Sequence, residues 1–495
     1  MLCAVMLSLS SCLIVINKPD APETTDAVQV DVTTAAQVTE APPAEEAVSA
    51  NDEAKHRLDS MLDYDMGGKT FILVTTDSNV PLPVGTARVL DKTRWEVLNE
   101  VSEKYGAELV ITRATRAKML SEFLESSAAG LYYADILCAQ SGEVGSLFAE
   151  SLVADLSDLP FLDLDAEYYY PLATESVTVN GRVYGVAGEA CVDYDVFGCV
   201  YADLDVLDAM NADVYADVEG GVWTLDRLLQ YAKQYEYAED GSYKGANAIS
   251  SAFDKSKAIE CLFEATGIRY IYQNDGQPAI YSPVGSPEAA VAAIRALCYT
   301  GNWGYYLTEE EKLAYSETEL SDTEELLQLD LLMMGKGVFY VGTLNDLARL
   351  YYSGRMLVPV PIPKLNAEQG TYVSPTAGEA CFFFIPADGA NITESAILIE
   401  ALNARAKGAI SEAYVTNALH YYIRNEKSVK MIETIIERPY FDLAVNFGGR
   451  YGAMRNVSYN TIIMAAETGL DVLDVHYWNY LTAVDVLAEI VSAAK

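Results

Sequence analysis

The sequence predicts an α/β fold in which strands and helices alternate along the chain. Three β-branched or apolar runs, at residues 70–75, 108–112 and 134–138, have the composition of buried strands. Amphipathic helical spacing fills the segments between them, at 94–105 and 117–129. This alternation is typical of βαβ units with parallel strands. Because such sheets bind ligands beyond the carboxyl ends of their strands, we expect a site in the residues that follow these runs.

The same periodicities continue through the rest of the chain. A short helix at 54–61 precedes the first strand. Further helices are predicted at 225–235, 259–266, 287–299, 322–334, 392–404, 411–422 and 471–494, and further strands at 337–341 and 380–385. The sequence contains no internal repeat. After the amino terminus it has no apolar run that could span a membrane.

The charge balance excludes one large class of partner. The 495 residues include 33 Lys and Arg against 72 Asp and Glu, a formal net charge of -39. Nucleic acid binding requires Lys and Arg that neutralise phosphates, so DNA and RNA are not expected as partners. Hydrophobic residues make up 51% and charged residues 21%, which is ordinary for a globular protein with a large core.

The amino terminus predicts a membrane anchor. Residues 1–16 are apolar but too short to span a bilayer as a helix. Within them, Leu9-Ser10-Ser11-Cys12 resembles the lipobox of bacterial lipoproteins, in which Cys12 would receive the lipid. No basic residue precedes this run and apolar residues follow Cys12, so an uncleaved hydrophobic anchor is the alternative. Residues 17–53 have the composition of a disordered tether. Either anchor would hold the protein on the extracellular face of the cell membrane.

Several local patterns, in order along residues 68–495, resemble the extracellular solute-binding protein family that includes the maltose-binding type. They are Ala134-Asp-Ile-Leu137 followed by Leu152-Val-Ala-Asp-Leu156, Val179-Asn-Gly-Arg-Val-Tyr-Gly-Val186, Cys199-Val-Tyr-Ala-Asp-Leu204, Val222-Trp-Thr-Leu-Asp-Arg-Leu-Leu229, Met334-Gly-Lys-Gly-Val-Phe339 and Pro359-Val-Pro-Ile-Pro-Lys364. Each pattern is weak alone. Their order and spacing carry the resemblance.

The resemblance implies a two-lobed fold of the type II periplasmic-binding-protein kind, with discontinuous lobes joined by hinge crossovers. The crossovers would lie near 187–195, 377–384 and 436–444. Residues 54–190 and 384–440 would form lobe 1, and residues 191–383 and 441–495 lobe 2. Members of that family capture a solute and deliver it to the permease subunits of an ABC importer, without catalysis. The resemblance therefore implies a binding protein with no cofactor.

Polar residues after the strands and in the crossovers are the candidate ligand-binding residues. A cap or a solvated loop residue is the alternative for each of them. The candidates are Asp77 and Ser78, next to Thr76; Gln140 and Ser141; Glu189 and Asp193; Thr343, Asn345 and Asp346; Glu379; and Arg450 with Tyr451.

Aromatic side chains suggest the kind of ligand. The chain has 34 Tyr against 13 Phe, a bias towards rings that can both stack and hydrogen-bond. Trp303 and Trp478 are the best candidates to stack on a sugar, whereas Trp95 and Trp223 are assigned to the core. A carbohydrate is therefore the first expectation. Polyamines, attracted by acidic groups, and peptides are the alternatives.

The sequence offers little material for catalysis. Gly67-Gly-Lys-Thr70 precedes a strand and lacks the earlier glycine, so it is not a phosphate loop. The histidines His56, His420 and His476 lie far apart, and the eight cysteines show no metal-binding spacing. We read the cysteines of the folded part as buried thiols; Cys191 and Cys199 are close enough to pair, but nothing requires it. Because carboxylates are abundant, a lipid-anchored glycosidase is the alternative function.

Overall fold

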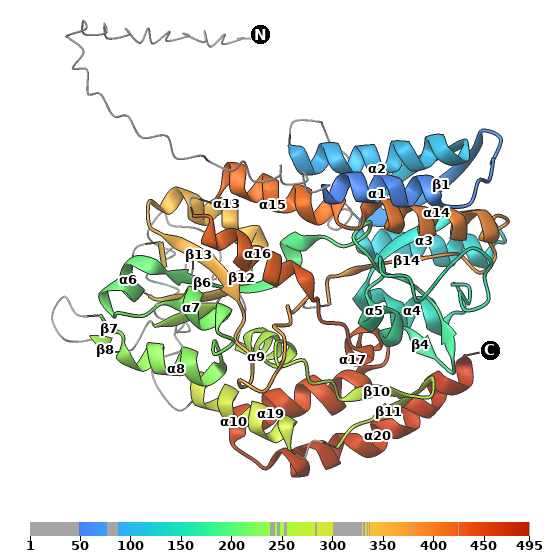
Figure 1. Ribbon diagram of the computed structural model, residues 1–495. Coiled ribbons are helices and arrows are strands. Elements are labelled where there is room, and N and C mark those ends of the chain that lie inside the picture. Colours follow the sequence, from blue (N-terminus) through green and yellow to red (C-terminus); the bar gives the residue numbers. More distant parts are fainter. Residues whose placement is uncertain are drawn as a thin grey trace, which may run out of the picture. The chain divides into compact units, whose positions relative to one another are not determined.

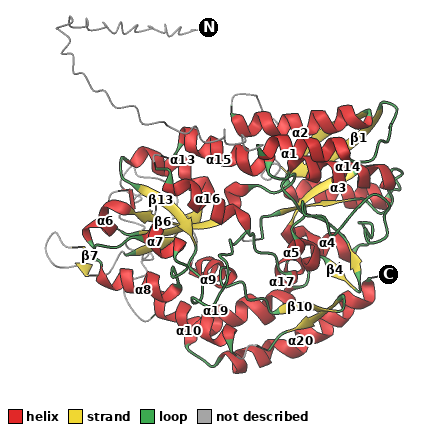
Figure 2. Cartoon of the chain, viewed as in Figure 1, coloured by secondary structure: helices red, strands yellow, loops and turns green. Residues whose placement is uncertain are grey.

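Two four-stranded sheets organise the protein. The first has the strand order β14-β3-β1-β2 and the second the order β13-β6-β12-β9 (Figure 1, Figure 2). The structure is a computed structural model, and it describes residues 49–76, 88–237, 243–244, 248–251, 255–282, 285–299, 329, 332–333, 335, 337–376, 378–423 and 425–494. All of these lie in one unit, Val48–Lys495.

The first sheet contains the predicted parallel strands. β1 (Lys69–Thr76) lies between β2 (Ala107–Ala114) and β3 (Ile136–Gln140) and is parallel to both. β14 (Cys381–Phe384) pairs antiparallel with β3, and Cys381 lies opposite Gln140. The carboxyl ends of three strands therefore meet along one edge, at Thr76, Ala114 and Gln140.

Four helices of the first half pack together in one layer. It consists of α1 (Ala50–Ser60), α2 (Val89–Tyr105), α14 (Ile392–Ala406) and α15 (Ala409–Tyr421), which pack against one another and lie side by side in Figure 1. The other helices of this half are α3 (Arg116–Ala128), α4 (Val144–Ala149), α5 (Pro171–Ser176), α17 (Leu443–Gly448) and α18 (Gly452–Arg455).

The first helix begins earlier than the sequence indicated. The Ser49 side chain accepts a hydrogen bond from the backbone N–H of Asp52 and so caps the helix, which starts at Ala50 instead of residue 54. Residues 50–53 are thus helical, although they were assigned to the tether of residues 17–53. The rest of that tether, up to residue 48, lies outside the described residues.

The second sheet is mostly antiparallel. β6 (Gly198–Asp203) pairs antiparallel with β12 (Phe339–Thr343) and with β13 (Leu357–Pro361), and β12 is parallel to β9 (Ile249–Ser251). Trp223 is fully buried in the core of this half, as predicted, and its indole N–H donates to the Pro361 carbonyl at 2.7 Å. Its helices are α6 (Leu204–Ala209), α7 (Val214–Glu219), α8 (Leu225–Gln234), α9 (Lys255–Glu264), α10 (Ser286–Cys298), α13 (Leu347–Leu350), α16 (Lys427–Glu437) and α19 (Thr461–Thr468).

The chain passes between the two sheets three times. It leaves the first half after β5 (Arg182–Val183) and enters β6, it returns between β13 and β14, and it passes again between α16, which packs on β13, and α17. The second and third passages pair through a bridge between Ser374 and Pro439. The lobe boundaries drawn from the sequence stay a prediction.

Two further elements join the halves. α20 (Val472–Ala493) places Val472 and Val475 in the second core, and Leu487 and Ile490 in the first. The hairpin of β10 (Ile271–Asn274) and β11 (Gln277–Ile280) contacts the hairpin of β4 (Thr178–Val179) and β5.

A glycine pair lets these two hairpins meet. The Gly181 N–H donates to the Gly276 carbonyl at 2.9 Å. A Cβ at Gly276, whose φ is +75°, would lie 2.9 Å from the Gly181 Cα, so the close approach requires glycine. The remaining short elements are β7 (Glu236–Tyr237), β8 (Tyr243–Lys244), the 3₁₀ turns η1 (Ser141–Glu143), η2 (Tyr194–Val196), η3 (Leu344–Asp346) and η4 (Tyr351–Ser353), and a π-helical turn, Asn456–Asn460.

Two predictions about individual side chains have different outcomes. The six cysteines in the described part of the chain are free and buried, as expected, and Cys191 does not pair with Cys199. Trp95 was assigned to the core, which is wrong: it is 46% exposed, because α2 buries the neighbouring stripe that includes Arg94, Val97 and Val101. None of the described helices is long and apolar enough to cross a bilayer.

Candidate functional site

Buried hydroxyl groups lie at the carboxyl edge of the first sheet. β1 ends at Thr76, and β3 ends at Gln140, directly before Ser141 of η1. Thr76 and Ser141 are almost completely buried. Within the described part of the chain, neither hydroxyl has a hydrogen-bond partner. Buried polar groups are normally paired, so this edge has unused capacity to hydrogen-bond a ligand.

Charged side chains lie beside Gln140 and η1. The Gln140 amide donates to the Glu379 carboxylate at 2.7 Å. Arg116, the first residue of α3, pairs with Glu143 through its Nε, and its Nη1 lies 3.8 Å from Glu379 Oε1. Gln140 and Glu379 were predicted from the sequence, whereas Arg116 and Glu143 were not. Arg116 could have been found by the same rule that selected Gln140, because it lies just after the end of β2, where a strand gives way to a helix.

Arg450 and Tyr451 join the same cluster from the carboxyl end of α17. α17 packs against η1 and α4. A Cβ at Gly449 would lie 2.6 Å from the Gly142 carbonyl, so the two loops touch through glycine. Arg450 lies 3.7 Å from Glu150, and the Tyr451 ring stacks on Phe447. The structure thus gathers five predicted residues around η1: Gln140, Ser141, Glu379, Arg450 and Tyr451.

The corresponding residues of the second sheet bond to one another. Thr343 and Asp346 form a capping box around η3, in which each side chain accepts from the other's backbone N–H. The Thr343 carbonyl accepts from the Tyr201 hydroxyl at 2.8 Å. Asn345 is exposed between them. Structural capping is therefore a sufficient explanation for Thr343 and Asp346.

Asp193 lies in the first passage, next to η2. Its carboxylate caps η2 by accepting from the Asp195 N–H at 3.1 Å. Burial, with a further contribution from Asp195, raises the pKa of Asp193 to about 6, although the positive charge of Arg94 opposes the shift. Asp195 accepts from the Tyr414 hydroxyl at 2.8 Å. Asp193 thus belongs to a charge cluster between η2, α2 and α15.

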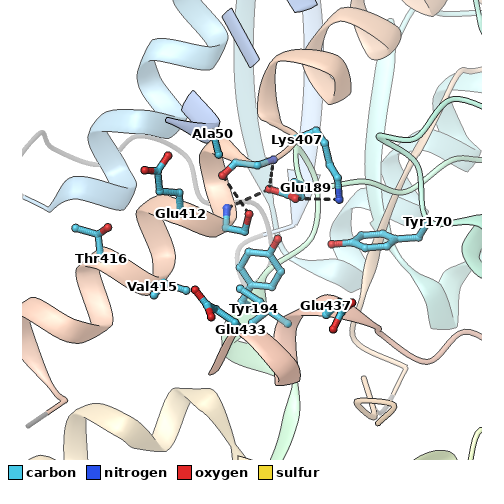
Figure 3. Close-up of a pocket in the computed structure, with 13 residues that line it drawn as sticks. Ala50, Tyr170, Glu189, Tyr194, Lys407, Glu412, Val415, Thr416, Glu433 and Glu437 are labelled. Atoms are coloured by element: carbon cyan, nitrogen blue, oxygen red, sulfur yellow. Dashed lines mark hydrogen bonds and ion pairs between the residues drawn. The ribbon is translucent and has the colours of Figure 1, made fainter. Parts of the chain in front are cut away.

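Glu189 lies at a pocket beside the passages (Figure 3). Its carboxylate accepts from the backbone N–H groups of Gly408 and Ser411, both at 3.0 Å, and lies 3.4 Å from the Lys407 ammonium. It thereby caps the start of α15. The pocket has a volume of about 490 Å³ and draws its lining from α15, α16, the first passage and the start of α1.

The remaining candidates do not join either site. Asp77, Ser78, Trp303 and the lipidation candidate Cys12 lie outside the described residues. Trp478 is 58% exposed on α20, and no hydrogen bond or ring contact links it to the residues gathered around η1 among the described residues. No group of three or more His, Cys, Asp or Glu side chains that could hold a metal ion occurs in the part of the chain that the structure describes.

Solved structures share this fold at low sequence identity. No protein-family model matches the sequence, and no curated protein matches it. A cyclo/maltodextrin-binding protein in complex with maltotetraose is 13% identical, with a TM-score of 0.54, over 87% of this chain and 100% of that one. The maltose-binding periplasmic protein of Listeria monocytogenes, in complex with maltose, is 13% identical, with a TM-score of 0.54, over 85% of this chain and 98% of its own.

A third match is the galacto-N-biose/lacto-N-biose I-binding protein of an ABC transporter from Bifidobacterium longum, in complex with lacto-N-biose. It is 12% identical, with a TM-score of 0.53, over 86% of this chain and 98% of that one. These likenesses establish the fold. The predicted α/β, two-lobed type II periplasmic-binding-protein architecture is confirmed.

Proposed function

We propose that this chain is the extracytoplasmic solute-binding protein of an ABC importer and that it captures a small carbohydrate. The observation that carries the proposal is the polar edge of the first sheet, in a fold shared with three proteins solved with sugars. In open sheets of this kind, ligands bind at the carboxyl ends of the strands.

The chemistry of this edge suits a sugar. Each sugar hydroxyl both donates and accepts a hydrogen bond, and so do the hydroxyls of Thr76 and Ser141. Gln140 offers an amide, while Arg116 and Glu379 offer charged groups, which form the stronger hydrogen bonds. Tyr451 adds a ring with a polar tip. This combination favours a ligand with many hydroxyls over an apolar one.

The remaining parts of the proposal concern partners and location. The apolar residues 1–16 with Cys12, followed by a tether, support a lipid anchor on the extracellular face of the membrane. The partners would be the permease subunits of the importer, to which the bound solute is delivered. We propose binding without turnover; the alternative, a glycosidase, would release reducing ends from an oligosaccharide and lose that activity when one carboxylate is replaced.

Calorimetric titration of the purified chain with maltose, maltotetraose and lacto-N-biose tests the proposal, with thermal unfolding as the companion measurement. A ligand at one hundred times its Kd stabilises a protein by about 2.7 kcal/mol, which raises the Tm by a few degrees. We expect at least one sugar to bind with one site per chain, without hydrolysis. A wider panel of mono- and oligosaccharides that neither binds nor shifts the Tm would contradict the proposal.

A further inference from the structure

The pocket beside the passages is a second cavity of ligand size, separate from the polar edge of the first sheet. Its volume, about 490 Å³, lies within the range of small-molecule sites. Figure 3 shows Glu412, Val415 and Thr416 of α15 on the left, Glu433 next to Val415, and Glu437 on the right, below Tyr170. None of the residues clustered around η1 lines it.

The floor of the pocket is aromatic. Tyr194 of η2 is almost fully buried and packs edge-on against Phe197 and Tyr414. Tyr170 lies beside it, with its ring tilted against Phe441. Burial raises the pKa of both Tyr170 and Tyr194, so both phenols stay neutral. Neutral rings of this kind can receive a cation on their faces.

The charges at the pocket are strongly unbalanced. Glu189 and Lys407, 3.4 Å apart, compensate each other. Glu412, Glu433 and Glu437 also line the pocket, and none of the three forms an ion pair with any residue that the structure describes. The Glu412 carboxylate accepts a hydrogen bond from the Asn51 backbone N–H at 3.1 Å, at the start of α1. The exposed carboxylates of Glu412, Glu433 and Glu437 thus give the lining an excess of negative charge beside its aromatic floor, which favours a cationic ligand over a neutral or anionic one.

The carboxylates stand on two separate helices. Glu412 belongs to α15, whereas Glu433 and Glu437 lie one turn apart on α16. A chain with an amino group at each end can pair with carboxylates on both helices at once. No group of side chains suited to a metal ion occurs among the described residues, which disfavours an inorganic cation.

We propose that this pocket binds a small organic cation with two or more amino groups, such as an aliphatic di- or triamine. The amino groups would pair with Glu412 on α15 and with Glu433 and Glu437 on α16, and the connecting chain would lie over Tyr170 and Tyr194. The site is spatially separate from the proposed carbohydrate site, because it shares no residue with the edge of the first sheet.

The pocket also connects the two halves of the fold. α15 packs on α1 and α2 of the first half, whereas α16 packs on β13 of the second. A ligand that contacts both helices binds more tightly to the arrangement of the halves that places both helices within its reach, and so shifts the equilibrium towards that arrangement. Occupation of this pocket therefore favours one arrangement of the halves.

Calorimetric titration of spermidine into the full chain at low ionic strength tests the site. We expect one site per chain. The double variant Glu433→Gln/Glu437→Gln should bind spermidine at least tenfold more weakly, and because both side chains are exposed, its Tm should not change. The control variant Glu368→Gln/Glu467→Gln makes the same change in net charge at exposed positions elsewhere and should bind like the unmodified chain.

A second variant tests the pocket by occupancy. Thr416→Arg places a cation at the exposed rim and should abolish spermidine binding, whereas Thr416→Gln should retain it. Absence of a spermidine site, or equal weakening in the Glu368/Glu467 control, would overturn the proposal, because the amine would then respond only to overall charge. Titrating the same variants with sugars separates the two proposals. Loss of spermidine binding and loss of sugar binding are measured independently, so either proposal can be contradicted without the other.

Discussion

The carboxyl edge of the first sheet and the matching edge of the second differ in how their polar groups are satisfied. At the first edge, the buried hydroxyls of Thr76 and Ser141 have no partner among the described residues. At the second edge, Thr343 and Asp346 cap each other around η3. The two edges occupy similar places in their sheets, but among the described residues that end β1, β3 and β12, buried hydroxyls without a partner lie at the first edge.

This difference assigns separate roles to the two halves. Leaving a buried polar group unpaired costs about 1–3 kcal/mol, so an edge that retains such groups is poised for a ligand that supplies the missing partners. A self-capped edge gains nothing from a polar ligand. We therefore expect the first half to provide most of the ligand's hydrogen bonds and the second half mainly to enclose it.

The largest effect that this comparison predicts is at Arg116. Replacing it in Arg116→Met should weaken sugar binding by about 2–3 kcal/mol, roughly a 30- to 150-fold increase in Kd, because a charged hydrogen-bond donor is lost. Calorimetric titration measures the change. The Arg116 side chain is 41% exposed, but the side chain of its partner Glu143 is only 13% exposed, so the variant should also have a somewhat lower Tm, which thermal unfolding measures separately from the Kd. An unchanged Kd would remove the first edge from the proposed site.

The third passage between the halves predicts a pH effect of about 2 kcal/mol. Asp442 is buried there and accepts hydrogen bonds from the Ala444 N–H and the Tyr440 hydroxyl, both at 3.0 Å. Burial raises its pKa to about 6. In the unfolded chain the Asp442 carboxyl has a pKa near 4. The folded state therefore binds this proton more tightly than the unfolded state does. The stability that this group contributes is present at low pH and is lost as the pH rises through 6.

The variant Asp442→Asn isolates this contribution. The difference in unfolding free energy between the original chain and the variant should fall by about 2 kcal/mol between pH 4 and pH 7, since one pKa unit is worth about 1.4 kcal/mol. Thermal unfolding at both pH values provides the measurement. A difference that stays constant with pH would show that the pKa of Asp442 is the same in the folded and the unfolded chain, which would contradict this prediction.

A smaller effect is expected at the cap of the second edge. Asp346→Ala removes a buried acceptor of the capping box and should lower stability by about 1 kcal/mol. The Kd for sugar should change by less than about threefold, because Thr343 and Asp346 already hydrogen-bond to each other around η3. A large loss of affinity with an unchanged Tm would reverse the roles assigned to the two edges.

The smallest effect is expected at Asn345. Its side chain is exposed between two capping residues, and surface substitutions usually change stability by less than about 0.5 kcal/mol. Asn345→Ala should therefore leave both the Tm and the sugar affinity nearly unchanged. A tenfold weaker Kd for this variant would show that the second edge contributes a direct hydrogen bond.

Much of the fold could be predicted from the sequence because its local signals agree with its tertiary structure. The run at 70–75 became β1 and the helical spacing at 225–235 became α8, since each has the period of a buried element. The start of α1 was missed because one side chain, Ser49, extends the helix into a segment of tether-like composition. Trp95 was misassigned because ring size alone does not reveal which stripe of a helix is buried.

The site was less predictable because residues after a strand can bind a ligand or merely cap the next element. Gln140 and Thr343 have equivalent sequence contexts, and only the coordinates separate the open edge from the capped one. Glu189 shows the same ambiguity, since it caps α15 through contacts with residues more than two hundred positions away. Non-local partners of this kind leave no periodic signal in the sequence.

The helix shared by the two cores limits how far the halves can separate. With 22 residues, α20 is roughly 33 Å long, and it is packed into the second core at one end and the first core at the other. A wide separation of the two halves would expose Leu487 and Ile490 to water. Exposing each side chain costs about 1.5–3 kcal/mol of burial free energy. Solute exchange is therefore expected to proceed by a modest rotation about this helix. Such a rotation opens only a narrow gap between the halves, which favours small, compact ligands.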